Sequence, residues 1–252
     1  MTSARAVLLV LAVLAGLSPA GSALAEETPT AADEARREAV DRLRRDLKKM
    51  AAGPYAAAKK DEILKDIEAL GVLGGVDGAK AALEALAFED PDVETQVFSL
   101  VETVHDKALV APLAALVEHR DYRRRFPLHE RIAHALAVIG DVSGIETLTT
   151  LIGSEQPKVV AASADALATF RSAPQEKRRD AVKRMIDLYE TTWNLKEGVR
   201  VQPQQREQAR ENWEVFSVAL RRALQALTGQ TGLSFPRQFR DWWNDNKKAK
   251  DW

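Results

Sequence analysis

The sequence predicts an all-α protein built from repeated helix pairs, an α-solenoid, and three observations support this prediction. Alanine and leucine dominate the hydrophobic residues, and no stretch of β-branched residues alternates as a strand would. Residues 139–170 have the pattern of a helix, a tight turn and a second helix. Similar segments precede this one along the chain. With 252 residues, the chain is long enough for one domain with a substantial core.

The segment 139–170 defines the repeat. Ser143 and Glu146 have the spacing of a capping box, in which two side chains satisfy free backbone N–H groups at the start of a helix. The apolar residues of this first helix recur on one side, at Ile145, Leu148, Leu151 and Ile152. Gly153 interrupts the helix, and Pro157 suits the first turn of the second helix, where no donor is needed.

The apolar positions of this unit coincide with those of segments upstream. In the second helix, Ala166 and Leu167 correspond to Ala135 and Leu136 one repeat earlier. In the first helix, the leucines at equivalent positions are Leu148, Leu113 and Leu83. The turns recur at steps of 31, 35 and 31 residues, through Leu73, Val104, Ile139 and Phe170. Self-similarity at this period is typical of a helical solenoid, in which each helix pair covers the apolar face of its neighbour.

Two turn motifs in this array carry a resemblance to a known family. They are Ile139-Gly140-Asp141, followed by Ile145, Leu148 and Leu151, and Asp90-Pro91-Asp92-Val93. On these residues the chain resembles HEAT-repeat proteins, specifically the short repeats related to those of phycobilisome lyases, between Ile63 and Phe170. The resemblance implies a right-handed superhelix of helix pairs with C-terminal capping helices. It implies no particular activity, because such repeats serve many unrelated roles.

Residues 1–25 have the three parts of a secretory signal. Arg5 provides the positive start, residues 6–17 form an apolar run, and Ala23-Leu24-Ala25 is a small-x-small cleavage site. The run is shorter than the ~20 residues that a membrane-spanning helix needs. The pattern predicts an exported protein, periplasmic or secreted, with no stable membrane span after cleavage. The alternative is a segment that stays uncleaved as an amphiphilic anchor.

The rest of the chain divides into three parts. Residues 26–59 contain a polar linker and a charged helix over 33–50, whose interspersed acidic residues argue against a membrane-surface helix. The narrow apolar stripe of that helix consists of Ala39, Leu43, Leu47 and Met50. Residues 60–172 hold the repeats, beginning with a helix over 60–73. Residues 173–252 hold helices that cap the solenoid, expected over 172–193, 207–227 and 235–248.

Charge and cysteine content exclude several kinds of site. Charged residues make up 29% of the chain but the formal net charge is −1, so the basic excess typical of nucleic-acid-binding proteins is missing. The expected partner is therefore another protein and not a nucleic acid. The chain contains no cysteine, which excludes disulfides, a thiol nucleophile and thiolate metal ligands.

His129 and His134 come closest to a metal-binding motif. In the zinc-peptidase motif, two histidines lie one helical turn apart on the same face. Five positions separate the histidines here, which rotates them by about 140° around a straight helix. They cannot bind one ion together, and we expect both at the edges of the helix. No phosphate-binding loop or nucleophile motif occurs, so the sequence predicts no catalytic residue, metal site or cofactor.

The inserted turn before Pro127 contains the first candidate binding site. Tyr122, Arg123, Arg124 and Arg125 form the densest positive cluster of the repeat region. Guanidinium groups in such a cluster could bind a carboxylate, a phosphate or an acidic partner. The alternative is an exposed turn whose arginines are solvated or pair with nearby acidic residues, which is the usual state of a charge run.

Two further sets of residues are candidates for partner binding. If the helices containing Leu83, Leu113 and Leu148 line the concave side, their exposed neighbours give that side an acidic character. These neighbours are Glu84, Glu118 and Glu146. Trp242 and Trp243 either cap the core or form an aromatic platform for a sugar ring or a partner.

The sequence therefore predicts an exported, non-catalytic scaffold that mediates protein–protein interaction. One alternative, implied by the family resemblance, is a lyase-like protein that acts on a tetrapyrrole-carrying partner. A second alternative is a cell-wall or polysaccharide-binding module that uses the two tryptophans. The absence of a recognisable catalytic motif favours the scaffold.

Overall fold

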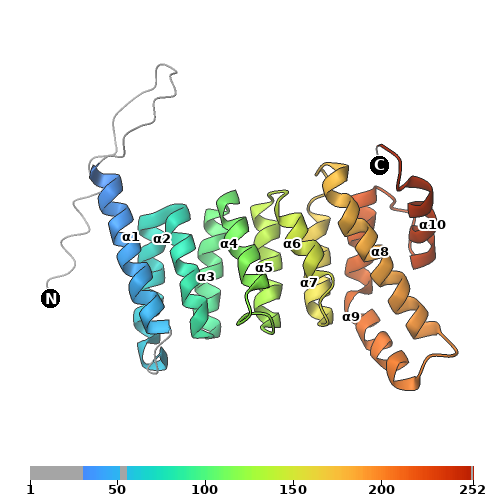
Figure 1. The fold of residues 1–252 in the computed structure, drawn as a ribbon, viewed down its shortest axis with the longest axis horizontal. Coiled ribbons are helices and arrows are strands. Elements are labelled where there is room, and N and C mark those ends of the chain that lie inside the picture. Colours follow the sequence, from blue (N-terminus) through green and yellow to red (C-terminus); the bar gives the residue numbers. More distant parts are fainter. Residues whose placement is uncertain (1–30, 52–55, 251) are drawn as a thin grey trace, which may run out of the picture. The chain divides into compact units, whose positions relative to one another are not determined.

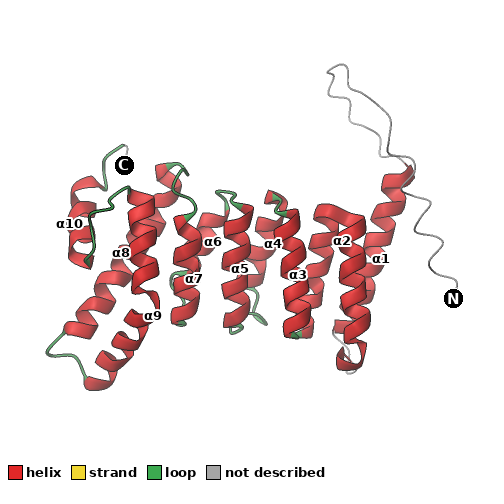
Figure 2. Ribbon diagram, turned by 180° about the vertical axis from the view of Figure 1, so that it is seen from behind, coloured by secondary structure: helices red, strands yellow, loops and turns green. Residues whose placement is uncertain are grey.

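The computed structural model describes residues 31–51, 56–250 and 252, and their regular structure is entirely helical (Figure 2). No β-strand occurs among these residues, which confirms the predicted all-α class. The chain divides into two units after Glu34, and the packing described below is that of residues 35–252. The predicted secretory signal, residues 1–25, lies outside the described residues.

The helices occur in the predicted order, with short 3-10 helices (η) between some of them. The elements before the inserted turn are α1 (Ala31–Ala51), η1 (Ala56–Lys59), α2 (Lys60–Ala82), η2 (Leu83–Phe88), α3 (Pro91–Val104), η3 (Lys107–Leu109) and α4 (Val110–Glu118). Those after it are α5 (Phe126–Ile139), α6 (Gly144–Leu151), α7 (Pro157–Ala168), α8 (Gln175–Glu197), α9 (Pro203–Thr228) and α10 (Pro236–Asn246).

Within residues 35–252, the helices lie side by side in chain order, each packed on its neighbours (Figure 1). Helices α3, α5, α7 and α9 contact one another in succession and form one row. Helices α4, α6 and α8 form a second row. Contacts between α4 and α5, α6 and α7, and α8 and α9 join the two rows, and α10 packs on α8. Successive helix pairs therefore cover one another's apolar sides.

The core contains the residues whose positions recur in the sequence. Leu113 and Leu148, at equivalent places in α4 and α6, are both completely buried. Leu136 and Leu167, at equivalent places in α5 and α7, are also completely buried. Ser163 is polar but equally buried, and its hydroxyl donates to the Val159 carbonyl at 2.7 Å, so its burial leaves no unsatisfied donor.

Turn residues set the ends of the helices. At the start of α3, the Asp90 side chain accepts a hydrogen bond from the Asp92 backbone N–H at 2.9 Å, and Pro91 occupies the first turn. Gly140 ends α5 with a φ of 68°, a left-handed conformation that glycine adopts without a side-chain clash. These two signals, both visible in the sequence, separate α3 and α5 from the helices beside them.

The prediction of a capping box at the start of α6 is wrong. The Ser143 backbone is helical, with φ −66° and ψ −20°, and its side chain makes no capping hydrogen bond to the helix. Instead, Asp141 accepts hydrogen bonds from the Ser143 hydroxyl and from the Ser143 backbone N–H, the latter at 2.9 Å. These hydrogen bonds lower the pKa of the Asp141 carboxyl, and the bond from the Ser143 hydroxyl has the larger effect. The Glu146 side chain is exposed.

Helix boundaries near glycines also differ from expectation. The predicted turn at 73–78 is a kink inside α2, where Gly75 has φ 45° and ψ −125°. Gly78 lies so close to the Leu70 carbonyl that an added Cβ would come within 2.2 Å of its oxygen. The helix expected over 172–193 begins at Gln175 and continues to Glu197, four residues beyond its expected end.

Candidate functional site

Small side chains leave a cavity between α4 and α6. Helix α4 buries Leu113 in the core and presents Ala111 and Ala114 on its other side, where their methyl groups fill little space. Helix α6 likewise buries Leu148 and presents Glu146. The cavity between these two surfaces has a volume of about 340 Å³.

A second cavity, of about 360 Å³, adjoins the first between α6 and α8. Helix α6 lines it with Thr149, and the first turns of α8 line it with Glu176 and Asp180. Ser143 and Glu146 line both cavities. The two cavities therefore lie next to each other across three successive helices of the same row, on either side of α6. We call the pair of cavities the α4–α6–α8 groove.

Acidic residues outnumber basic residues in the α4–α6–α8 groove. Its charged side chains are Glu118, Glu146, Glu176, Asp180, Lys107 and Lys177. Four carboxylates and two ammonium groups leave a formal charge of −2. The four carboxylates are all exposed, and within the described part of the chain none of them has an ion pair. Their charge is therefore available to a partner.

Two hydroxyl groups in the groove already donate to backbone carbonyls and can only accept further hydrogen bonds. The Thr149 hydroxyl donates to the Ile145 carbonyl at 2.7 Å, and the Thr150 hydroxyl donates to the Glu146 carbonyl at 3.1 Å. Each hydroxyl has thereby used its single donor and keeps lone pairs that can accept. With the carboxylates, these oxygens form a surface suited to ammonium and guanidinium groups.

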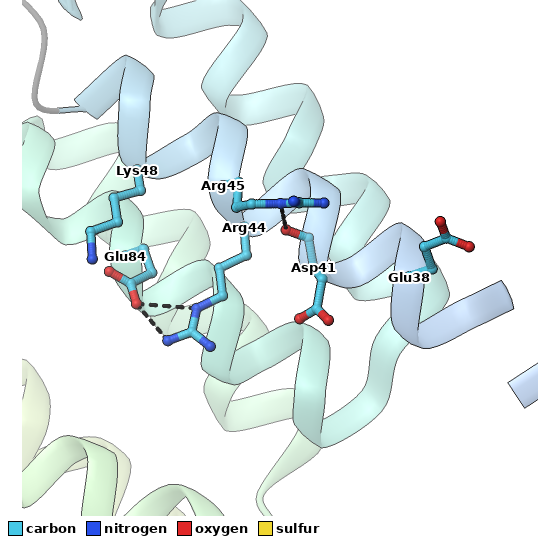
Figure 3. Close-up of a pocket in the computed structure, with 6 residues that line it drawn as sticks. All are labelled: Glu38, Asp41, Arg44, Arg45, Lys48 and Glu84. Carbon is cyan, nitrogen blue, oxygen red and sulfur yellow. Dashed lines mark hydrogen bonds and ion pairs between the residues drawn. The ribbon is translucent and has the colours of Figure 1, made fainter. Parts of the chain in front are cut away.

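The structure brings two of the three predicted acidic residues together and places the third elsewhere. Glu118 and Glu146 line the groove. Glu84 lines a separate hollow of about 550 Å³ between α1 and η2, where Arg44 approaches it at 2.7 Å (Figure 3). That hollow is lined by three acidic and three basic residues, Glu38, Asp41, Glu84, Arg44, Arg45 and Lys48. Because these charges balance, we assign the hollow no ligand.

The four residues of the inserted turn have different environments. The Arg125 side chain is only 15% exposed, donates to the Leu86 carbonyl at 2.6 Å and forms an ion pair with Glu94. Its guanidinium also lies 5.1 Å from the centre of the half-buried Tyr122 ring. Arg125 therefore anchors the turn to η2 and α3. Arg123 and Arg124 are exposed, and no ion pair involves them within the described chain.

Trp242 and Trp243, the predicted aromatic pair, differ in exposure. Trp243 is 5% exposed and belongs to the core. Trp242 is half-buried and lies edge-on to the Trp252 ring, with ring centres 5.4 Å apart. A buried indole has no free face for a sugar or a partner, so these two residues do not form an open platform.

His129 does not lie at a helix edge, contrary to the expectation from the sequence. It is 5% exposed, and its Nε2 is buried without a hydrogen-bond partner. Burial lowers the pKa of the His129 imidazole, although a hydrogen bond with the Tyr122 backbone opposes this effect. His134 is exposed, as expected, with Nδ1 3.0 Å from the Glu102 carboxylate. His129 is therefore a neutral core residue whose neighbours include the Phe126 ring.

Glu176 and Asp180 were not predicted as site residues, although the sequence contains a signal for one of them. Glu146 lies two residues before the buried Leu148, and Asp180 lies two residues before the buried Val182. Extending the register of the first helices into α8 would have placed Asp180 beside Glu146. Glu176 precedes Asp180 by one helical turn and lies on the same face of α8.

The described residues contain neither a metal-binding cluster nor a membrane-spanning helix. Among the described residues, no group of three or more His, Asp or Glu side chains is arranged to hold a metal ion. Within the same residues, no helix has both the length and the hydrophobicity needed to cross a membrane. The α4–α6–α8 groove is therefore characterised by its charge and shape alone.

Comparisons with known proteins give no match, whether to protein-family models, to curated proteins or to solved structures. The resemblance to HEAT-repeat proteins remains a prediction based on the repeat motifs around Asp90 and Ile139. A function for this chain is therefore proposed from the geometry and charge of its own residues.

Proposed function

We propose that this chain is an exported, non-catalytic scaffold of HEAT-like helix pairs that binds another protein through the α4–α6–α8 groove. The observation that carries the proposal is the set of four exposed carboxylates without ion pairs that line two adjacent cavities on successive helices. Successive helices of one row contribute these residues. Repeat proteins bind partners on such surfaces because stacking places equivalent side chains in a row.

Two features support the solenoid component of this proposal. The helices form two rows in which each member contacts the next, as α3, α5 and α7 do. The leucines that recur in the sequence, such as Leu113 and Leu148, occupy equivalent buried positions in α4 and α6. A stack of this kind buries a continuous core while every contact remains local.

The charge of the groove indicates the chemistry of the partner. Exposed carboxylates and hydroxyl lone pairs favour a segment that presents lysine or arginine side chains. Because the carboxylates are exposed, their attraction for such a segment is screened by salt. The proposal therefore implies a complex whose association slows as the ionic strength rises.

Charge reversal in the groove tests the proposal. The double variant Glu118→Lys, Glu146→Lys places two positive charges where the partner's basic groups would lie. In affinity capture from the producing cell's own envelope extract, followed by titration of the recovered partner, we expect binding to weaken by more than about tenfold. The reason is that like charges brought together repel, in addition to the loss of two attractive contacts.

A charge-matched control separates this effect from that of net charge. Glu68 on α2 and Glu211 on α9 are exposed and lie outside the groove. The variant Glu68→Lys, Glu211→Lys changes the net charge equally and should retain the partner. If the groove variant retains every partner that the unmodified protein captures, the proposed function is wrong.

Export is tested separately from partner binding. Cleavage after Ala25 would leave Glu26 as the first residue of the mature chain. Mass spectrometry of the protein recovered outside the cytoplasm should show that terminus. Recovery of the protein only from the cytoplasm, with residues 1–25 intact, would contradict export and leave the groove test unaffected.

A further inference from the structure

A small pocket with aromatic walls lies between α8, α9 and the segment that precedes α10. It has a volume of about 230 Å³, and its main lining residues are Tyr189, Trp193, Trp213, Val218, Arg221 and Phe235. We call it the aromatic pocket. It shares no residue with the α4–α6–α8 groove. Its size is below that of most pockets for drug-sized ligands and suits a single side chain or ring.

The walls of the aromatic pocket are held in place by contacts among the rings. Tyr189 and Trp213 stack in parallel with centres 4.8 Å apart, and Tyr189 donates a hydrogen bond to the Ser234 carbonyl at 3.2 Å. The centre of the Trp193 ring lies 5.0 Å from that of Trp213 and 6.3 Å from that of Phe235. Because the rings fix one another, the pocket is preorganised for a ligand.

The mouth of the pocket is apolar and exposed. Phe235 is 58% exposed and Val218 is 54% exposed, and both line the pocket. Val215, one turn before Val218 on α9, is 43% exposed. Large apolar side chains grouped at the surface around an aromatic pocket mark a contact area for another molecule.

Arg221 gives the pocket a single positive charge. It lines the pocket, and in the described part of the chain it has neither a hydrogen bond nor an ion pair. Tyr189 lines the same pocket, where burial raises the pKa of its phenol and the positive charge of Arg221 opposes this increase. No carboxylate lines the pocket. The guanidinium is therefore available to an anionic group.

A cation is not the preferred ligand. The Lys196 ammonium already lies over the aromatic rings, 4.6 Å from the centre of Trp193 and 5.5 Å from that of Trp213. Lys196 is paired with Glu197 and already occupies the faces of these rings, and Arg221 at the wall would repel an incoming cation. A neutral sugar is also a poorer match, because no carboxylate or carboxamide lines the pocket and only the serines Ser217 and Ser234 offer hydroxyl groups to it.

We propose that the aromatic pocket binds an aromatic side chain of a partner protein that carries a carboxylate beside it. The ring would occupy the pocket and pack against Trp193, Trp213 and Phe235, which line it. The carboxylate would pair with Arg221, whose planar fork matches carboxylate geometry. Val218 would cover the edge of the inserted ring. This inference does not depend on the α4–α6–α8 groove.

Nuclear magnetic resonance with small probes tests the proposal. The chain has five tryptophans, each with one indole N–H signal, which single Trp→Phe variants assign. N-acetyl-phenylalanine should shift the signals of Trp193 and Trp213 and leave those of Trp242 and Trp243 unchanged. Its amide, which lacks the charge, should bind about tenfold more weakly, because a charge-assisted hydrogen bond is lost.

Two arginine variants make the test specific. Arg221→Gln should abolish the preference for the free carboxylate over the amide. Arg222→Gln is the matched control, because Arg222 is exposed and pairs with Asp165 on α7, and it should keep the preference. The proposal is wrong if both probes bind the unmodified protein equally, if all five indole signals shift together, or if N-acetylglucosamine shifts Trp193 and Trp213 while N-acetyl-phenylalanine does not.

Discussion

Three arginines adjacent in the sequence have different environments in the structure. Arg125 donates to the Leu86 carbonyl and pairs with Glu94, more than thirty positions away in the chain. Arg123 and Arg124 point to solvent. Removing one member of an ion pair costs the most stability where the remaining charge is buried, because water cannot replace the lost contact.

The first prediction concerns these arginines. Arg125→Met should lower the free energy of unfolding by about 2 kcal/mol, since it leaves the Glu94 carboxylate, itself 14% exposed, without its cation. Arg123→Ala and Arg124→Ala should each change it by less than about 0.5 kcal/mol. Urea denaturation followed by circular dichroism measures all three.

A double variant shows whether the uncompensated charge is the cause. Arg125→Met with Glu94→Gln removes both charges and should cost less than Arg125→Met alone. If the three single variants have equal effects, the anchoring interpretation of Arg125 is incorrect.

The second prediction concerns the pH dependence introduced by His129. Burial lowers the pKa of its imidazole in the folded protein below the ordinary value of 6.5. As the pH falls below about 6.5, the unfolded chain takes up this proton before the folded protein does, which favours unfolding. The free energy of unfolding should therefore be highest above about pH 6.5 and decrease as the pH falls through the folded pKa.

Substitution identifies the histidine responsible. His129→Leu should flatten the decrease between about pH 7 and pH 5 in denaturant titrations, because the titrating group is gone. His134→Gln removes an exposed histidine and should leave the decrease in place. An unchanged profile in His129→Leu would show that another group produces it.

At the scale of the element, the kink in α2 depends on one glycine. Gly75 has φ 45° and ψ −125°, and an added Cβ would meet no atom within 4 Å. Gly75→Ala should therefore destabilise the protein by about 1–3 kcal/mol through backbone strain alone. Gly232→Ala is the matched control, since Gly232 also has open space around its Cα but no positive φ. Equal thermal stability of the two variants would contradict the strained conformation of Gly75.

Most helices were predictable because their apolar periodicity is strong. The leucines at 113, 136, 148 and 167 were expected in the core and are buried there. The helix starts were less predictable, as Ser143 shows. Which of Ser143 and Asp141 receives the local hydrogen bonds depends on backbone angles that the residue types do not fix.

The candidate site was predictable only in part. Glu118 and Glu146 could be found because the repeat register places them beside core positions. The surroundings of Arg125 and His129 could not, because they depend on contacts between segments distant in the sequence. The aromatic pocket was missed for the same reason: its walls come from three elements whose pairing no local pattern indicates.

At the scale of the whole molecule, packing between neighbours predicts uneven stability along the chain. Helix α5 contacts α3, α4, α6 and α7, whereas α1 is the first of the described helices and belongs to neither row. The described side chains of α1 include only three buried apolar ones, Val40, Leu47 and Met50. In a structure stabilised by neighbouring contacts, the terminal element opens at a lower free energy than the interior ones.

Two leucines of equal burial test this difference. Leu47 in α1 and Leu136 in α5 are both completely buried. Leu136→Ala should lower the free energy of global unfolding by about 3 kcal/mol, whereas Leu47→Ala should lower it by less than about 1 kcal/mol, because α1 opens before the rest unfolds. Hydrogen exchange should show faster exchange confined to α1 in Leu47→Ala. Equal costs for the two variants, with uniform loss of protection, would mean that α1 unfolds together with the rest of residues 35–252 and that the stability is not graded along the chain.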